Sequence, residues 1–135
     1  MKPPDQAKRE LVAQWVGKAL RDFDLALDLL RENRPYPEAI CFHAQQAAEK
    51  YLKAFLTWHE VEFPKTHAIE KLLRLVRNVD PNLAGSLHEA TALSAYAVEV
   101  RYADDLVQVG SEEANQAVEH ARLVRDAIRA RLPSI

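Results

Sequence analysis

The residues best suited to chemistry gather in one irregular stretch in the last third of the chain. Arg101 and Tyr102 stand there beside the carboxylates Glu99, Asp104 and Asp105. A guanidinium presents a planar fork to phosphate, and a tyrosine can stack on a base or donate its hydroxyl. Long connections in compact helical proteins are often functional. The alternative is that Arg101 pairs with a neighbouring carboxylate and only holds the loop, since ion pairs near helix ends are common.

Residue types that bind metals occur both in this stretch and around the single cysteine, Cys41. Glu99, Asp104 and Asp105 could hold Mg²⁺ together with a substrate phosphate, but three close carboxylates in a loop are usually solvated charge. Cys41 and His43, two residues apart on a helix, point to different faces, and no second ligand pair follows at metal spacing. The sequence therefore predicts no metal site.

Histidines are scattered along the chain, and one of them lies in its most apolar segment. His43 could transfer protons near neutral pH. The alternative is a half-buried imidazole whose hydrogen bonds are satisfied by a neighbour. The other four stand in different predicted elements: His59, His67, His88 and His120.

A basic stripe follows near the C-terminal end, where Arg122, Arg125 and Arg129 recur at steps of three and four. Cations are favoured at a helix C-terminus in any case, so a role in nucleic-acid binding is the minority interpretation.

Composition excludes several classes of function. The glycines Gly17, Gly85 and Gly110 are too far apart for a glycine-rich phosphate loop, which excludes Walker and Rossmann chemistry. With a formal net charge of -2, binding to nucleic acid would need a local basic patch. The lone Cys41 cannot form an internal disulfide, and no signal peptide or 18-residue apolar run is seen. We therefore expect a cytoplasmic protein that neither spans nor binds a membrane.

The element that must position these groups is an uninterrupted run over residues 41–58. Apolar residues cover more than half of its circumference, from Ile40 through Ala47 and Tyr51 to Trp58, so it predicts a helix covered on several sides. Its polar residues are grouped, and we expect them to form one narrow solvent-facing strip: Gln45, Gln46, Glu49, Lys50 and Lys53. This segment is the predicted central helix of a bundle.

Other segments supply the partners of that helix. Steps of three and four predict helices over residues 12–30, 69–76, 81–97 and 111–132. Prolines mark the earlier breaks, and before residue 111 the periodicity fails and Gly110 precedes the next start. Thr66 or His67, Asp80 and Ser111 are the expected N-caps. The prediction is an all-α fold: an up-and-down antiparallel helical bundle of four main helices plus one short helix, in a single domain over residues 1–135.

The central run also carries a family resemblance. The stretch from Phe42 to Ala54, FHAQQAAEKYLKA, together with Pro64-Lys65-Thr66-His67, Tyr96 and Arg101-Tyr102, resembles the HEPN domain, the higher eukaryotes and prokaryotes nucleotide-binding domain. The resemblance implies a homodimer that partners a minimal nucleotidyltransferase, in some cases as a toxin-antitoxin pair. Transferred to this sequence, it implies a nucleotide-binding groove lined by Arg101, Tyr102, Lys50 and His43, with ATP, another nucleotide or RNA as ligand and no resident cofactor.

One branch of that family consists of metal-independent ribonucleases, in which an arginine precedes a histidine with four to six residues between them. Such a histidine handles protons at the ribose 2′-hydroxyl, while the arginine stabilises charge on the phosphate. The corresponding positions after Arg101 hold Leu106, Val107 and Gln108, so the motif is absent. The sequence therefore favours a non-catalytic binding module. A ribonuclease toxin that uses Arg101 with the non-adjacent His43 or His67 stays as the alternative.

Overall fold

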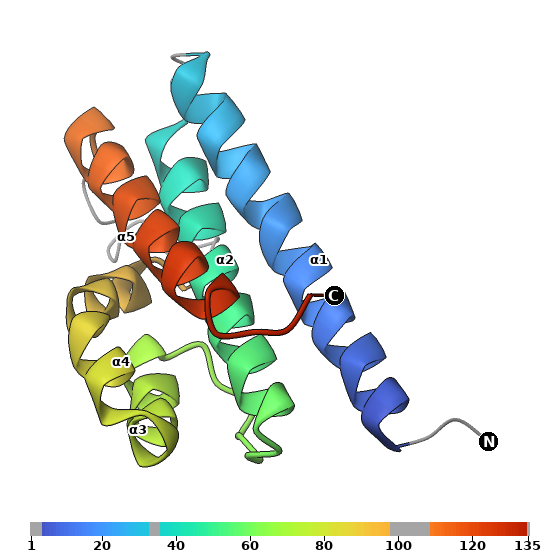
Figure 1. Ribbon diagram of the computed structural model, residues 1–135. Coiled ribbons are helices and arrows are strands. Elements are labelled where there is room, and N and C mark those ends of the chain that lie inside the picture. The colour runs from blue at the N-terminus through green and yellow to red at the C-terminus, as the bar shows by residue number, and fades with distance from the viewer. Residues whose placement is uncertain (1–3, 33–35, 98–108, 135) are drawn as a thin grey trace.

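The computed structural model describes residues 4–32, 36–97 and 109–134, which form helices and the loops between them, with no strand among them. The elements follow in the order α1 (Pro4–Arg31), α2 (Pro37–Trp58), α3 (Ile69–Val79), α4 (Pro81–Ser86), the 3₁₀-helix η1 (His88–Tyr96) and α5 (Ser111–Arg129). Figure 1 shows α1, α2 and α5 lying side by side; α3 and η1 also contact α2, and α4 packs against α3 and η1. The predicted all-α bundle is confirmed. Arg101 and Tyr102 lie outside the described residues.

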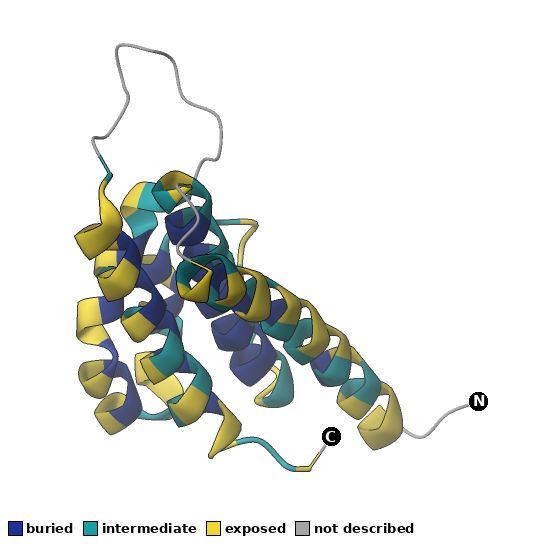
Figure 2. Ribbon diagram, turned by 90° about the horizontal axis from the view of Figure 1, so that it is seen from above, coloured by how far each residue is buried: buried dark blue, intermediate teal, exposed yellow. Residues whose placement is uncertain are grey.

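Helix α2 is the centre of the bundle, as its composition predicts. It contacts α1, α5, α3 and η1, and its large side chains Tyr51, Leu52, Phe55 and Leu56 are fully buried. Figure 2 shows the buried residues on the inward faces of the helices and the exposed ones outside. The small alanines of α2 allow neighbouring helices to approach closely, and the large residues fill the space between them.

Helix α2 ends in a Schellman motif. Val61 N donates to Leu56 O at 2.9 Å and Glu60 N donates to Thr57 O at 3.0 Å, which satisfies carbonyls that the helix end leaves without partners. Glu60 has a positive φ of 58° and is the only non-glycine residue with a positive φ in the described part of the chain. A glutamate thus occupies the left-handed position that glycine usually takes.

The fourth predicted helix is not continuous, which corrects the expectation of one helix over residues 81–97. Asp80 caps α4 as predicted, because its Oδ1 accepts a hydrogen bond from Leu83 N at 3.0 Å. After Ser86 the chain continues as η1, which places Leu87, Ala90 and Leu93 in the core at steps of three. A 3₁₀-helix has three residues per turn, so this spacing puts all three on one face.

Two of the predicted caps lie a residue or two away from the real helix starts. Ala68 is the N-cap of α3, although Thr66 Oγ1 does accept from Ala68 N at 3.1 Å. Gly110 is the N-cap of α5, and its N–H donates to Glu113 Oε2 at 2.9 Å. No helix among the described residues is long and apolar enough to cross a membrane.

Candidate functional site

The polar residues of α2 do not form the expected solvent-facing strip. Gln45 is fully buried, and Glu49 and Lys53 are only 3% and 8% exposed. The chain between α2 and α3 covers this side of the helix, since His67 and Phe63 both contact it. The buried polar groups are therefore satisfied by one another rather than by solvent.

Glu49 is the centre of this buried network. Its Oε1 accepts from Gln45 Nε2 at 3.1 Å and lies 2.9 Å from His67 Nδ1, while its Oε2 accepts from Lys53 Nζ at 2.9 Å. Gln45 Nε2 also donates to the carbonyl of His67 at 2.9 Å. Gln46 Nε2 extends the network by donating to Gln45 Oε1 at 2.6 Å. The network therefore fixes the segment before α3 to the side of α2.

Aromatic rings surround the cationic end of the network. Lys53 Nζ lies 5.5 Å from the centroid of Trp15 and 5.8 Å from that of Phe63, and the two rings meet edge to face at 6.1 Å. An ammonium near ring faces gains cation–π energy that partly offsets its burial. Trp15 and Phe63 also line a shallow groove of about 550 Å³.

A second, more accessible polar group lies between α1 and α2. Asp22 of α1 binds His43 Nδ1 through Oδ1 at 2.9 Å and accepts from Lys50 Nζ through Oδ2. All three side chains are partly exposed. Partial burial acts to raise the pKa of Asp22, but the hydrogen bonds from His43 and Lys50 outweigh it and hold that pKa below its usual value. Asp22 therefore stays ionised at neutral pH and compensates the charge of Lys50.

This Asp22–His43–Lys50 cluster can bind an anion and move a proton. The carboxylate orients the imidazole through Nδ1, which leaves Nε2 as the nitrogen that can face a ligand. The cluster is neutral when His43 is neutral and carries one positive charge when His43 is protonated. Protonation therefore adds a donor and a charge that favour phosphate, with Lys50 as a second cation.

Similarity to known proteins identifies the family. The family model of the HEPN domain matches residues 12–131, which is most of the chain. The chain belongs to the HEPN domain family. Among solved structures, the crystal structure of TT1696 from Thermus thermophilus shares 24% identity at a TM-score of 0.71, covering 90% of this chain and 98% of its own. The crystal structure of ST0689, an archaeal HEPN homologue, shares 20% identity at a TM-score of 0.67; the match covers 89% of this chain and 96% of the ST0689 chain. No curated protein matches significantly.

The residues predicted for the site in this HEPN domain fall into two groups. His43 and Lys50 come together on α2, one on each side of the Asp22 carboxylate. His67 is separate from them and belongs to the Glu49 network, with its ring 65% exposed. The predictions for Arg101 and Tyr102 fall in the range 98–108, outside the described residues.

Asp22 is the site residue that sequence reasoning missed. Periodicity places it beside the buried Phe23 on α1, where any acidic residue would be taken as solvated charge. Its pairing with His43 and Lys50 depends on how α1 is aligned against α2. The spacing of residues within one helix does not predict this alignment. The ion pair between Glu49 and Lys53 had a signal, because glutamate followed by lysine at the fourth position is the favourable order for a helical ion pair, but this order does not predict that the pair is buried.

Metal binding and thiol chemistry find no support in the described part of this HEPN domain. The described residues contain no cluster of three or more histidine, cysteine or acidic side chains that could hold a metal ion. Cys41 is buried, and this burial, with the nearby charges of Glu113 and Glu38, raises the pKa of its thiol to about 12. Cys41 is therefore an uncharged core residue at neutral pH.

Proposed function

We propose that this HEPN domain is a nucleotide-binding and interaction module that forms a homodimer and binds a minimal nucleotidyltransferase. The observation that carries the proposal is the Asp22–His43–Lys50 cluster. It offers cationic donors at a partly exposed position, within the segment that bears the family resemblance. The missing arginine-to-histidine spacing favours binding over cleavage.

ATP titration of the purified protein by calorimetry tests the binding half of the proposal. Lys50→Gln removes a cation that would face the phosphates, and we expect it to weaken ATP binding about tenfold, the loss of roughly one charge-assisted hydrogen bond. Lys71→Gln, which changes an exposed lysine on α3, should leave the affinity within about twofold. Equal affinities for the wild type and Lys50→Gln would remove this cluster from the nucleotide site.

Co-expression tests the partner half. The protein should co-purify at a fixed stoichiometry with a minimal nucleotidyltransferase encoded beside it, and should itself run as a dimer in size-exclusion chromatography. A monomer that ignores both the transferase and ATP would contradict the proposal. If the pair acts as toxin and antitoxin, expressing one member alone should arrest growth and expressing both should restore it.

One observation favours a second candidate, a metal-independent ribonuclease. His43 is held through Nδ1 by a carboxylate, an arrangement that suits a general base or acid at Nε2. Cleavage of total RNA and defined hairpins in EDTA, abolished in both Arg101→Ala and His43→Ala, would establish it. Intact RNA after incubation with folded protein would leave the binding module as the function.

A further inference from the structure

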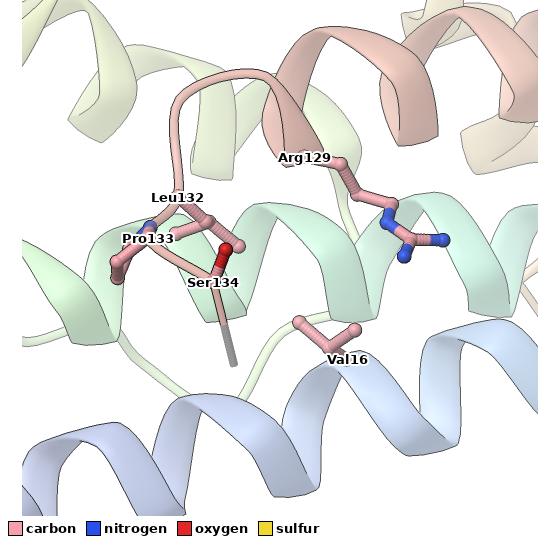
Figure 3. A pocket seen from close by; sticks show the side chains of 5 residues that line it. All are labelled: Val16, Arg129, Leu132, Pro133 and Ser134. Carbon is pink, nitrogen blue, oxygen red and sulfur yellow. The ribbon is translucent and has the colours of Figure 1, made fainter.

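A groove on the other side of the α1–α2 pair contains an arginine that pairs with no carboxylate of the described residues. It has a volume of about 280 Å³ and lies between α1 and the end of α5, lined by Val16, Arg129, Leu132, Pro133 and Ser134. Figure 3 shows the Arg129 side chain reaching from α5 toward the space above Val16, with the C-terminal segment closing the groove. Within the described ranges, no carboxylate pairs with Arg129. Its guanidinium thus faces the groove with donors to spare.

The two other arginines of the α5 stripe also face α1. The guanidinium carbons of Arg122 and Arg125 lie 5.6 Å and 4.5 Å from the ring centroid of Phe23. Each has a carboxylate neighbour as well, Glu119 at 3.3 Å and Asp126 at 2.9 Å respectively. Covering Phe23 and pairing with α5 therefore account structurally for these two arginines, but not for Arg129.

A buried tyrosine hydroxyl close to Arg129 also lacks an acceptor. Tyr51 of α2 is fully buried, and no atom of the described residues accepts the proton of its hydroxyl. The charges of Arg129 and Arg125 act to lower the pKa of this hydroxyl, and Arg129 also acts on it as a hydrogen-bond donor, but a guanidinium only donates and cannot accept the hydroxyl proton. Burial raises the pKa of Tyr51, so the hydroxyl stays a neutral donor at neutral pH. What is missing at this place is an acceptor.

We propose that the α1–α5 groove binds a phosphate group, with Arg129 as the main ligand and the Tyr51 hydroxyl, which lies close to Arg129, as a further donor. A guanidinium fork matches two phosphate oxygens, and an anion supplies the acceptors that Arg129 and Tyr51 need. The phosphate can come from a nucleotide or from the backbone of RNA.

This groove is distinct from the Asp22–His43–Lys50 cluster. On α1, Asp22 of the cluster follows Val16 of the groove by six residues, so the two side chains point about 120° apart around the helix axis. The cluster and the groove therefore lie on different sides of the α1–α2 pair. The proposal goes beyond nucleotide binding at the cluster and does not depend on it.

Calorimetric titration with pyrophosphate at low ionic strength tests the groove. We expect Arg129→Gln to weaken binding about tenfold or more and Tyr51→Phe, which removes only the oxygen, to weaken it about threefold. Arg131→Gln is the matched control, because Arg131 pairs with Asp80 at 3.4 Å and does not line the groove; its affinity should stay within about twofold. Circular dichroism checks that each variant is folded.

Absence of pyrophosphate binding, or an equal loss in Arg129→Gln and Arg131→Gln, would overturn the proposal. Competition by ATP or by a short RNA without terminal phosphates identifies the source of the phosphate, and competition by neither means that the groove takes the free anion. Lys50→Gln separates this proposal from the proposed function. Loss of ATP binding in Lys50→Gln alone supports the cluster, whereas loss of pyrophosphate binding in Arg129→Gln alone supports the groove.

Discussion

At the scale of single residues, Glu49 is the side chain on which most of the buried polar network depends. It is almost completely buried and compensates the buried ammonium of Lys53, while holding Gln45 and His67. Removing one partner of a buried ion pair leaves the other without compensation, which costs more than the pair contributes. The stability of the protein therefore depends on the charge of Glu49 more than on the shape of its side chain.

Glu49→Gln should destabilise the protein by about 3 kcal/mol, because it leaves Lys53 as an unpaired buried cation. Urea unfolding followed by circular dichroism measures this change. Glu119→Gln breaks an exposed pair with Arg122 and should cost less than about 1 kcal/mol. If the two variants lost similar free energies of unfolding, the buried network would contribute no more to stability than an exposed ion pair.

Cys41 makes stability depend on pH in a definable window. Its thiol has a pKa of about 12 when folded, against 9.0 as the reference, so the unfolded chain loses the proton first. A pKa raised on folding contributes stability that is complete below pH 9 and is lost as pH rises toward 12. At a pH about 1.5 units above the reference value, this loss is about 2 kcal/mol.

Urea unfolding at neutral and at alkaline pH, for the wild type and Cys41→Ala, checks this expectation. Tyr51 is present in both proteins, whereas Cys41 itself helps to raise the pKa of Tyr96, so the difference between the two pH dependences reports the thiol together with its effect on Tyr96. Cys41→Ala should lose about 2 kcal/mol less than the wild type over this interval. Parallel pH dependences would contradict a buried, neutral thiol.

At the scale of elements, the C-terminal end of α2 contains a residue with an unfavourable backbone conformation, Glu60. Glu60 adopts a left-handed conformation that brings its Cβ close to the backbone, and its contact with Lys8 Nζ is exposed and 3.8 Å long. Glycine has no Cβ and suits this position of a Schellman motif. The ion pair that glycine would lose contributes little.

Glu60→Gly should therefore stabilise the protein by about 0.5–1 kcal/mol, measured as a higher midpoint of thermal or urea unfolding. Glu60→Ala also removes the carboxylate but keeps the Cβ, so it should bring no gain. A stability of Glu60→Gly at or below that of Glu60→Ala would show that the left-handed conformation is not strained.

Elements with strong periodicity could be predicted from sequence, and those formed by tertiary contacts could not. The alanine-rich run of α2 and the heptad-like steps of α1 identify both helices. The break after Ser86 was missed, because apolar residues at steps of three and four fit an α-helix equally well. Ser94 Oγ, which accepts from Ile69 N at 2.9 Å and donates to Glu70 Oε2 at 2.7 Å, holds η1 on α3, and this contact is long-range in sequence.

At the scale of the whole molecule, the bundle puts its polar residues on two sides of the α1–α2 pair. The Asp22–His43–Lys50 cluster and the Glu49 network lie on one side and the Arg129 groove on the other. His43 and Lys50 could be predicted as site candidates from the family run. Asp22 joins these two residues, and Tyr51 is buried behind the arginines. The roles of both depend on how the helices pack together, which the sequence pattern does not predict.

The central claim is that the Asp22–His43–Lys50 cluster receives the nucleotide. The most direct test is ¹H–¹⁵N NMR of the histidine rings during a titration with ATP. His43 ring signals should shift and saturate at the affinity found by calorimetry, while those of His120 on α5 stay in place. Shifts confined to other histidines, or none at all at saturating ATP, would contradict the account.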